Sequence, residues 1–153
     1  MLRSCTDVEW FENYLVGDEF AGETAEFTEE EIVAFAERYD PQPFHVDRSA
    51  AAASQFGGII ASGTQLFAMV WGAMTRAGFL NGRGMGSPGL EMRCLRPVRP
   101  GDALTVRSHV RETRSSRKRE DRGYVSFETV ATNQDGEVAV KLLYQQILPV
   151  RPR

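Results

Sequence analysis

The sequence contains one long uncharged stretch, Phe56–Thr75, in which twenty residues pass without an acidic or basic side chain. Ser62 is a natural N-cap, and the residues from Gly63 onward show a broad apolar face at helical spacing with a weakly polar opposite side. A helix that is apolar nearly all round is usually buried from several sides. Its uncharged part would be about 20 Å long, short of the ~30 Å hydrocarbon core of a bilayer. We therefore predict a buried central helix and no membrane span.

The chain changes character after Gly86, where strand-like patterns replace helical ones. Residues 104–111 alternate apolar and polar side chains, the period of a strand with one buried face. An Asp-Gly pair at 135–136 is typical of a hairpin turn. Helices come first and an antiparallel meander follows, which favours an α+β fold with the sheet packed on the central helix. The expected strands are 90–96, 104–111, 124–132 and 138–148, with turns at 97–102, 115–122 and 133–136.

Composition limits the organisation and the partners of the chain. Its 153 residues suit one domain, residues 1–153, because no repeat or low-complexity linker divides them. Cys5 and Cys94 form neither a disulfide framework nor a metal-binding spacing, and acidic residues occupy the start of the chain where a secretion signal would be apolar, so we expect a cytoplasmic protein. Residues 93–122 carry ten Lys or Arg and four Asp or Glu within a chain of net charge -3. This asymmetry favours a local anionic partner rather than nucleic acid.

The first half of the chain predicts helices with clear starts. Residues 1–13 have the look of a loosely attached lead-in, with Trp10 and Phe11 as docking points. Thr28 and Glu31 have the spacing of a capping box at the start of a helix that ends before Pro41. An Asp at position 47 is a plausible N-cap for a short alanine-rich helix.

The stretch Tyr39–Asp47 is the strongest candidate for chemistry. Pro41 and Pro43 fix φ at two positions and push the residue before each out of the helical region, which predicts a rigid loop. Asp40 and His45 lie on this loop, and a carboxylate and an imidazole at a set separation can divide general acid and base work near neutral pH. A plainer interpretation is that Asp40 only ends a helix or starts a turn and that His45 is an ordinary surface residue.

Ser62-Gly63 marks a second candidate, the start of the central helix. A helix N-terminus presents free amides and a partial positive charge, which can polarise a carbonyl oxygen as an oxyanion hole does. Glycine at position 63 would let a ligand approach the backbone closely. The alternative is that Ser62 only caps the helix and Gly63 only permits tight packing. Ser62 lacks the strand-turn-helix pattern of a serine nucleophile.

Three segments together resemble the MaoC-like dehydratases, a family that includes the (R)-specific enoyl-CoA hydratases. Residues 39–45, Tyr-Asp-Pro-Gln-Pro-Phe-His, resemble the family's Asp-x-Asn-Pro-x-His motif. Residues 56–63, Phe-Gly-Gly-Ile-Ile-Ala-Ser-Gly, are similar to the segment that follows it and opens the central helix. Residues 95–102, Leu-Arg-Pro-Val-Arg-Pro-Gly-Asp, resemble a later strand and turn. The resemblance runs from about Thr28 to the C-terminus.

This resemblance implies a hotdog fold, a curved antiparallel sheet wrapped round one long helix, usually dimeric through sheet edges. Asp40 and His45 match the catalytic pair that activates water and moves a proton at the substrate α-carbon. Gly63 matches the position whose amide binds the thioester oxygen, with Ser62 beside it. The implied reaction is reversible addition of water to a trans-2-enoyl thioester, the work of a hydro-lyase that needs no cofactor or metal.

The sequence departs from the family pattern at two positions. Gln42 stands where the family has Asn, so the hydrogen bonds by which it orients the loop are expected to differ. Ser62 stands where many relatives have His. Two other functions remain open: a hotdog acyl-CoA thioesterase and a non-catalytic acyl-thioester-binding protein. Residues 63–80 contain no Asp or Glu, which disfavours the thioesterase.

The resemblance also implies partners. The substrate would be an acyl-CoA or an acyl carrier protein thioester, and the chain would form a homodimer or a dimer of dimers, since the open edges of the meander need cover. Guanidinium groups suit phosphate geometry, so part of the basic segment is expected to meet the phosphates of a CoA carrier. The candidates are Arg96, Arg99, Arg117 and Arg119, with Arg114 and Lys118 nearby.

Overall fold

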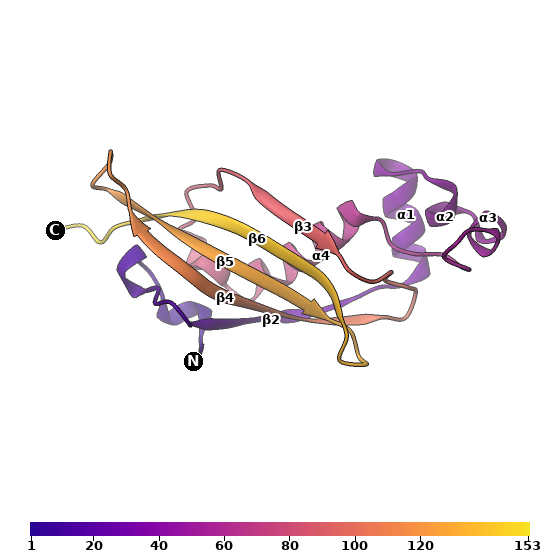
Figure 1. Ribbon diagram of the computed structural model, residues 1–153, viewed down its shortest axis with the longest axis horizontal. Helices are drawn as coiled ribbons and strands as arrows, with labels where there is room; N and C mark the ends of the chain where they lie inside the picture. Colours follow the sequence, from indigo (N-terminus) through magenta and orange to yellow (C-terminus); the bar gives the residue numbers. More distant parts are fainter.

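A single curved sheet wraps around one helix in the computed structural model, which describes residues 1–153 (Figure 1). The strands lie in the order β1-β2-β4-β5-β6-β3. Only β1 and β2 run parallel, and every other neighbouring pair is antiparallel. The strands are β1 Leu2–Arg3, β2 Glu19–Glu26, β3 Leu90–Cys94, β4 Ala103–Ser115, β5 Arg122–Thr132 and β6 Val138–Pro149.

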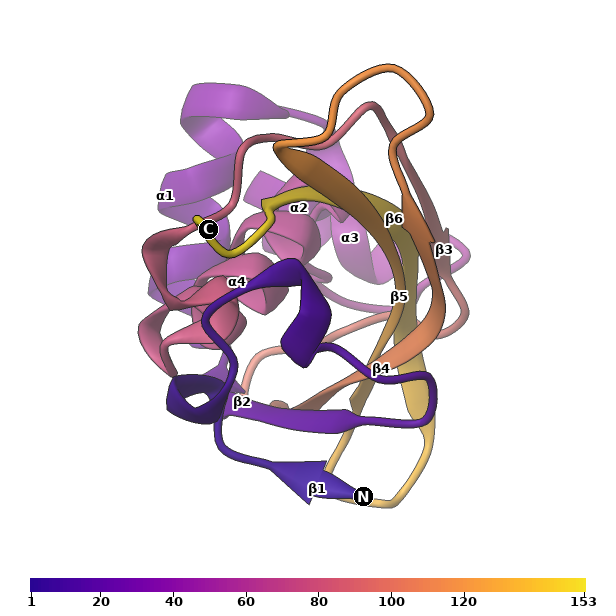
Figure 2. The same ribbon diagram turned by 90° about the vertical axis from the view of Figure 1, so that its left-hand side faces the viewer.

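The helices divide between the sheet's concave face and one end of the molecule. The central helix α4, Gly63–Arg76, lies within the curve of the sheet, as the end view shows (Figure 2). Three shorter helices cluster beyond one end of the sheet (Figure 1): α1 Glu29–Tyr39, α2 Pro43–Val46 and α3 Arg48–Ala53. Single 3₁₀ turns occupy η1 Cys5–Asp7, η2 Phe11–Asn13 and η3 Phe79–Gly82. This arrangement confirms the predicted α+β hotdog architecture.

The core lies between α4 and the sheet. Buried and half-buried side chains alternate along β5 and β6, as expected of strands with one covered face. Val70, Ala73 and Met74 of α4 are fully buried, and α4 lies nearest to β2 and β4 of the sheet. The helix approaches β2 so closely that a Cβ at Gly22 would lie 2.8 Å from the Met74 sulfur, so a larger residue there would force Met74 to shift. No helix in this fold combines the length and apolarity that crossing a bilayer would require.

The three predicted helix caps are all present. Ser62 Oγ accepts from the Gln65 amide at 3.2 Å, and Asp47 Oδ1 accepts from the Ala50 amide at 2.7 Å. Thr28 Oγ1 accepts from the amide of Glu31 at 3.2 Å but donates to that residue's own carboxylate at 3.1 Å. The capping box is therefore half formed, because the carboxylate reaches the hydroxyl rather than the Thr28 amide.

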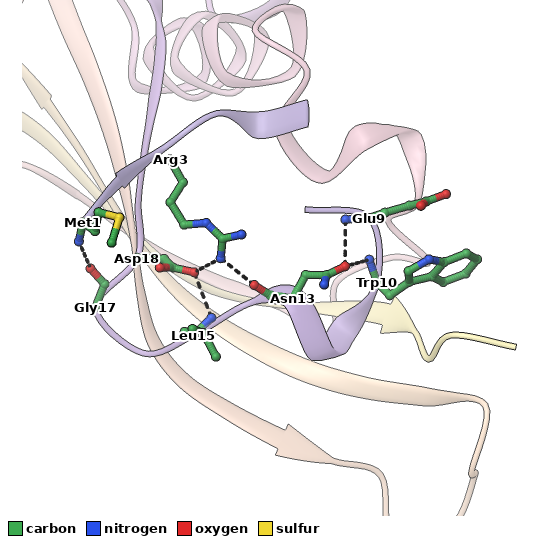
Figure 3. Close-up of polar contacts among 8 residues, drawn as sticks. All are labelled: Met1, Arg3, Glu9, Trp10, Asn13, Leu15, Gly17 and Asp18. Carbon is green, nitrogen blue, oxygen red and sulfur yellow. Dashed lines mark hydrogen bonds and ion pairs between the residues drawn. The ribbon is translucent and has the colours of Figure 1, made fainter. Parts of the chain in front are cut away.

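The N-terminal segment corrects one prediction, because it is tied to the domain rather than loosely attached (Figure 3). The Arg3 guanidinium donates to the buried Asp18 carboxylate at 2.7 Å and to the Asn13 carbonyl at 2.6 Å. Phe11 covers Gly123, where a Cβ would lie only 2.3 Å from its ring. Trp10 packs under the Arg83 guanidinium at 4.0 Å. The two aromatic residues do dock, and the surrounding polar contacts fix the segment between them.

Candidate active site

Asp40 and His45 meet because the chain turns sharply between α1 and α2. Asp40 is the C-cap of α1, since Pro41 prevents the helix from continuing. Pro43 then stands at the first position of α2, where its missing N–H costs nothing. The turn brings Asp40 Oδ2 to 3.4 Å from His45 Nε2. The segment expected to be a rigid loop thus contains one helical turn, and His45 is buried on it rather than exposed.

The other ring nitrogen of His45 shows where a proton must be. Nδ1 lies 2.7 Å from the backbone carbonyl of Ile60, and a carbonyl can only accept. Nδ1 therefore carries a hydrogen, so in the neutral ring Nε2 is an unprotonated acceptor. Two acceptors then face each other, Nε2 and the Asp40 carboxylate. A proton shared between them, or one supplied by a molecule that reaches both, is needed to join the pair.

Gln42 orients the carboxylate. Its Nε2 donates to Asp40 Oδ1 at 2.8 Å, which leaves Oδ2 turned toward His45. The Gln42 amide also donates to the Asp40 carbonyl at 2.7 Å, and the Gln42 carbonyl accepts from the His45 amide at 2.9 Å. A single residue therefore holds both members of the pair, through its side chain and its backbone.

The N-terminus of α4 faces the same cavity as His45. Ser62 is fully buried, and its hydroxyl is engaged in capping the helix. Gly63 is half-buried, and its amide belongs to the first turn, where N–H groups have no acceptor within the helix. A Cβ at Gly63 would only touch Met92 and Cys94 at ordinary contact distances, 3.5 and 3.7 Å. Packing within the chain therefore does not require glycine there.

The cavity that His45 and Gly63 share has a volume of about 250 Å³ and a mainly apolar lining. Cys94 contributes a thiol whose pKa is raised above its ordinary value by burial. A larger hollow of about 560 Å³, beside Trp71 and Gln146, lies further along α4 and contains none of the predicted site residues. The rest of the smaller cavity's lining includes Phe56, Ile60, Leu66, Leu95 and Val98.

The four predicted phosphate-binding arginines fall into two separate groups. Arg96 lines the cavity and pairs with Glu137 at 3.2 Å, while Arg99 donates to the carbonyl of Phe56 at 2.5 Å. Arg117 and Arg119 lie on the β4–β5 hairpin, at the end of the molecule opposite α1–α3 (Figure 1). The structure thus brings the first two arginines to the site and leaves the other two far from it.

Sequence reasoning missed two contributors to the site. The Ile60 carbonyl fixes the tautomer of His45, and no side-chain pattern reports a backbone acceptor fifteen residues away. Cys94 was detectable in principle, because it alternates with Leu90 and Met92 on the inward positions of the expected strand. No three His, Cys, Asp or Glu side chains gather closely enough to hold a metal ion together.

Comparison with known proteins places this geometry in a family. Residues 13–132 match the model of the MaoC like domain. A MaoC-like dehydratase from Rhodospirillum rubrum is 34% identical, with a TM-score of 0.90 over 95% of this chain and 100% of that one. A monoamine oxidase regulatory protein from Archaeoglobus fulgidus is 27% identical, with a TM-score of 0.85 over 94% and 95% of the two chains. The (R)-hydratase PhaJ1 from Pseudomonas aeruginosa is 26% identical, with a TM-score of 0.72 over 93% and 86%. The chain therefore belongs to the MaoC-like domain family, whose members include hydratases and dehydratases.

Proposed function

We propose that this protein is an (R)-specific 2-enoyl-CoA hydratase, which reversibly adds water to a trans-2-enoyl thioester. The observation that carries the proposal is the meeting of an acid-base pair and a helix N-terminus at one small apolar cavity. Water addition needs a proton removed from water and a proton delivered to carbon, which a carboxylate and an imidazole can divide. The likeness to the (R)-hydratase PhaJ1 supports the same reaction.

The geometry supports the following course for this reaction. The thioester oxygen would lie at the Gly63 amide, where the dipole of α4 stabilises the enolate-like charge that develops as C3 is attacked. The Asp40/His45 pair would take one proton from water as its oxygen bonds to C3, and return one proton to C2. The net change is addition of one water molecule. Both transfers would occur from one face of the double bond, because the two groups lie only 3.4 Å apart.

Hydration and free-thiol release should be followed in parallel with crotonyl-CoA as substrate. Loss of the enoyl absorbance without thiol release supports the hydratase. Release of thiol would instead identify a thioesterase, although residues 63–80 offer no carboxylate for one. Neither signal, combined with tight binding of the thioester, would identify a non-catalytic acyl-binding protein and overturn the proposal. Two free cysteines are consistent with a reduced, cytoplasmic setting, which we propose for the reaction.

We also propose a homodimer built on β3, which is one of the two edge strands of the sheet. Leu90 and Leu95 are half exposed along it, 49% and 53%. A two-fold axis through Met92 pairs the strand with its own copy in antiparallel fashion. Glu91 then lies opposite the partner's Arg93, and Arg93 opposite the partner's Glu91. Cross-strand pairs of opposite charge stabilise such an arrangement, and like charges destabilise it.

Reversing one of these charges tests the dimer. Arg93→Glu places acidic residues opposite each other twice and should weaken dimerisation about tenfold, since each cross-strand pair contributes ~0.2–1 kcal/mol. The double swap Glu91→Arg with Arg93→Glu restores opposite charges and should restore the dimer. Sedimentation equilibrium measures both. A wild-type protein that remains a ~17 kDa species at micromolar concentration would contradict the dimer.

A further inference from the structure

The two predicted arginines beside the Asp40/His45 cavity are both engaged within their own chain. Arg96 is paired with Glu137, and Arg99 is bound to a backbone carbonyl. The basic hairpin at the far end is different. We call residues 114–122 the basic tip, where a hollow of about 410 Å³ is lined by Arg114, Arg117, Lys118, Arg119 and Arg122.

Some of the positive charges of the basic tip are not neutralised by acidic side chains and can therefore bind an anionic ligand. Asp121 engages Arg122 at 2.9 Å and Arg119 at 3.6 Å. The hydrogen bond from Arg122 lowers the pKa of this carboxyl to about 2, so the acid is fully occupied with its own neighbours. Arg117 and Lys118 have no acidic partner. An unpaired cluster of this kind fits the phosphates of an anionic ligand.

The register of the sheet shows which cavity the tip can serve. Arg122 pairs with Pro149, and Cys94 of the cavity pairs with Val140. Nine residues of β6 therefore separate tip and cavity within one chain, about 30 Å along the strands and two strand spacings across. Roughly twenty covalent bonds join the sulfur of coenzyme A to its 3′-phosphate, about 25 Å when fully extended. The backbone separation of the two features in one chain, about 31 Å, therefore exceeds the extended length of one coenzyme A.

In the proposed dimer, the two-fold axis through β3 places the tip of one copy closer to the cavity of the other copy. Met92 pairs with Leu142, so the tip begins seven residues from the axis, about 23 Å. The partner's Cys94 lies on the same side, about 7 Å from the axis, and three strand spacings of ~4.8 Å separate it from the tip. The resulting distance is about 20 Å, within reach of coenzyme A. In both views the tip also rises on the β3 side of the sheet (Figures 1 and 2).

We propose that the basic tip of one copy binds the nucleotide phosphates of the coenzyme A thioester held at the Asp40/His45 cavity of the other copy. This inference rests on the proposed function and on the proposed β3 dimer, since it assumes that a thioester enters that cavity and that the two copies pair through β3. It gives the basic segment a role in trans and makes each site incomplete in the isolated chain.

The first test is the binding of coenzyme A itself to the intact dimer, measured by titration calorimetry. Arg117→Gln with Arg119→Gln should weaken binding about tenfold or more. Arg107→Gln with Lys141→Gln is the matched control, since it removes two positive charges from the outer face of the sheet and should leave binding unchanged. Equal loss in both variants, or no loss in the tip variant, would overturn the proposal. So would a tip effect with an acyl carrier protein and none with coenzyme A.

A mixed dimer distinguishes whether a cavity is served by the tip of the partner copy (in trans) or by the tip of its own chain (in cis). One subunit carries Gly63→Leu, which fills the cavity, and the other carries the tip substitutions; different affinity tags isolate the mixed species. In trans, the open cavity faces an intact tip, so one site per dimer binds with wild-type affinity. If the tip acts in cis, the open cavity lies on the same chain as the substituted tip. That site is then lost and the proposal fails. The readout needs no turnover, so a protein that binds in trans but hydrates nothing would overturn the proposed function alone.

Discussion

The two ends of the molecule recognise charge in different ways. At the α1–α2 end, one buried histidine and one carboxylate are held 3.4 Å apart by the Gln42 side chain and the Ile60 carbonyl. At the basic tip, four exposed cations and the partly buried Arg122 surround a shallow hollow and touch mainly their own neighbours. Proton transfer needs positions accurate to a fraction of an ångström, whereas attraction of phosphates needs only charge nearby. The first end should therefore be sensitive to small changes of shape, and the second to changes of charge.

The sharpest test of this contrast is removal of the acid-base pair. Asp40→Asn and His45→Ala should each lower kcat for a short trans-2-enoyl-CoA by ~10²-fold or more, the contribution expected of a general acid or base. The double variant should be little worse than the worse single one, because groups that act as a unit are not additive. Circular dichroism serves as the folding control.

A different result is expected if the pair is only structural. A well-folded Asp40→Asn that keeps more than about half of the wild-type kcat would exclude general acid or base catalysis by this carboxylate.

The double variant of the tip, Arg117→Gln with Arg119→Gln, provides the comparison at the other end of the molecule. It should raise KM for the coenzyme A substrate while leaving kcat near normal, because it removes binding energy that does not change in the transition state.

Gln42 tests whether shape alone matters at the catalytic end. Gln42→Ala changes no charge but frees Asp40 Oδ1, so the carboxylate loses its fixed orientation toward His45. We expect kcat to fall about tenfold with KM little changed, since a misplaced group affects mainly the transition state. Gln42→Asn, the shorter amide, should recover part of the rate. Equal kcat values in all three proteins would show that Gln42 does not position the pair.

The sequence predicted the parts of this fold whose causes are local. The caps at Thr28, Asp47 and Ser62 follow from side-chain oxygens placed before helical periods. The strands follow from alternation, and the turn at residues 133–136 from its Asp-Gly pair. The attachment of the N-terminal segment could not be predicted, because it depends on a hydrogen bond between Arg3 and the buried Asp18, fifteen residues further along the chain.

The site shows the same division between local and distant causes. Asp40 and His45 are five residues apart on one proline-stiffened turn, so their meeting could be predicted, and Gln42 lies between them. The Ile60 carbonyl, which fixes the His45 tautomer, belongs to another segment. The separation of Arg117 and Arg119 from Arg96 and Arg99 depends on strand lengths and register, which composition does not report. The sequence indicated the charge of the basic segment but not which cavity it could reach.

The smallest expected effect concerns Cys94, which marks the cavity and not the tip. Its side chain is exposed, yet partial burial raises the pKa of its thiol, so alkylation by iodoacetamide near neutral pH should be slower than for an ordinary exposed cysteine. The rate should rise about tenfold per pH unit until the thiol pKa is reached. Cys5 is buried in the core and serves as an internal reference that reacts still more slowly.

Crotonyl-pantetheine, which has no nucleotide phosphates, should protect Cys94 as fully at saturation as crotonyl-CoA does, but at a higher concentration. The tip variant should erase that concentration difference without altering protection at saturation, as mass spectrometry of the labelled peptides would show. Protection by the CoA thioester alone, at any concentration, would mean that the phosphate contacts and the cavity are not separable in the way the two ends suggest.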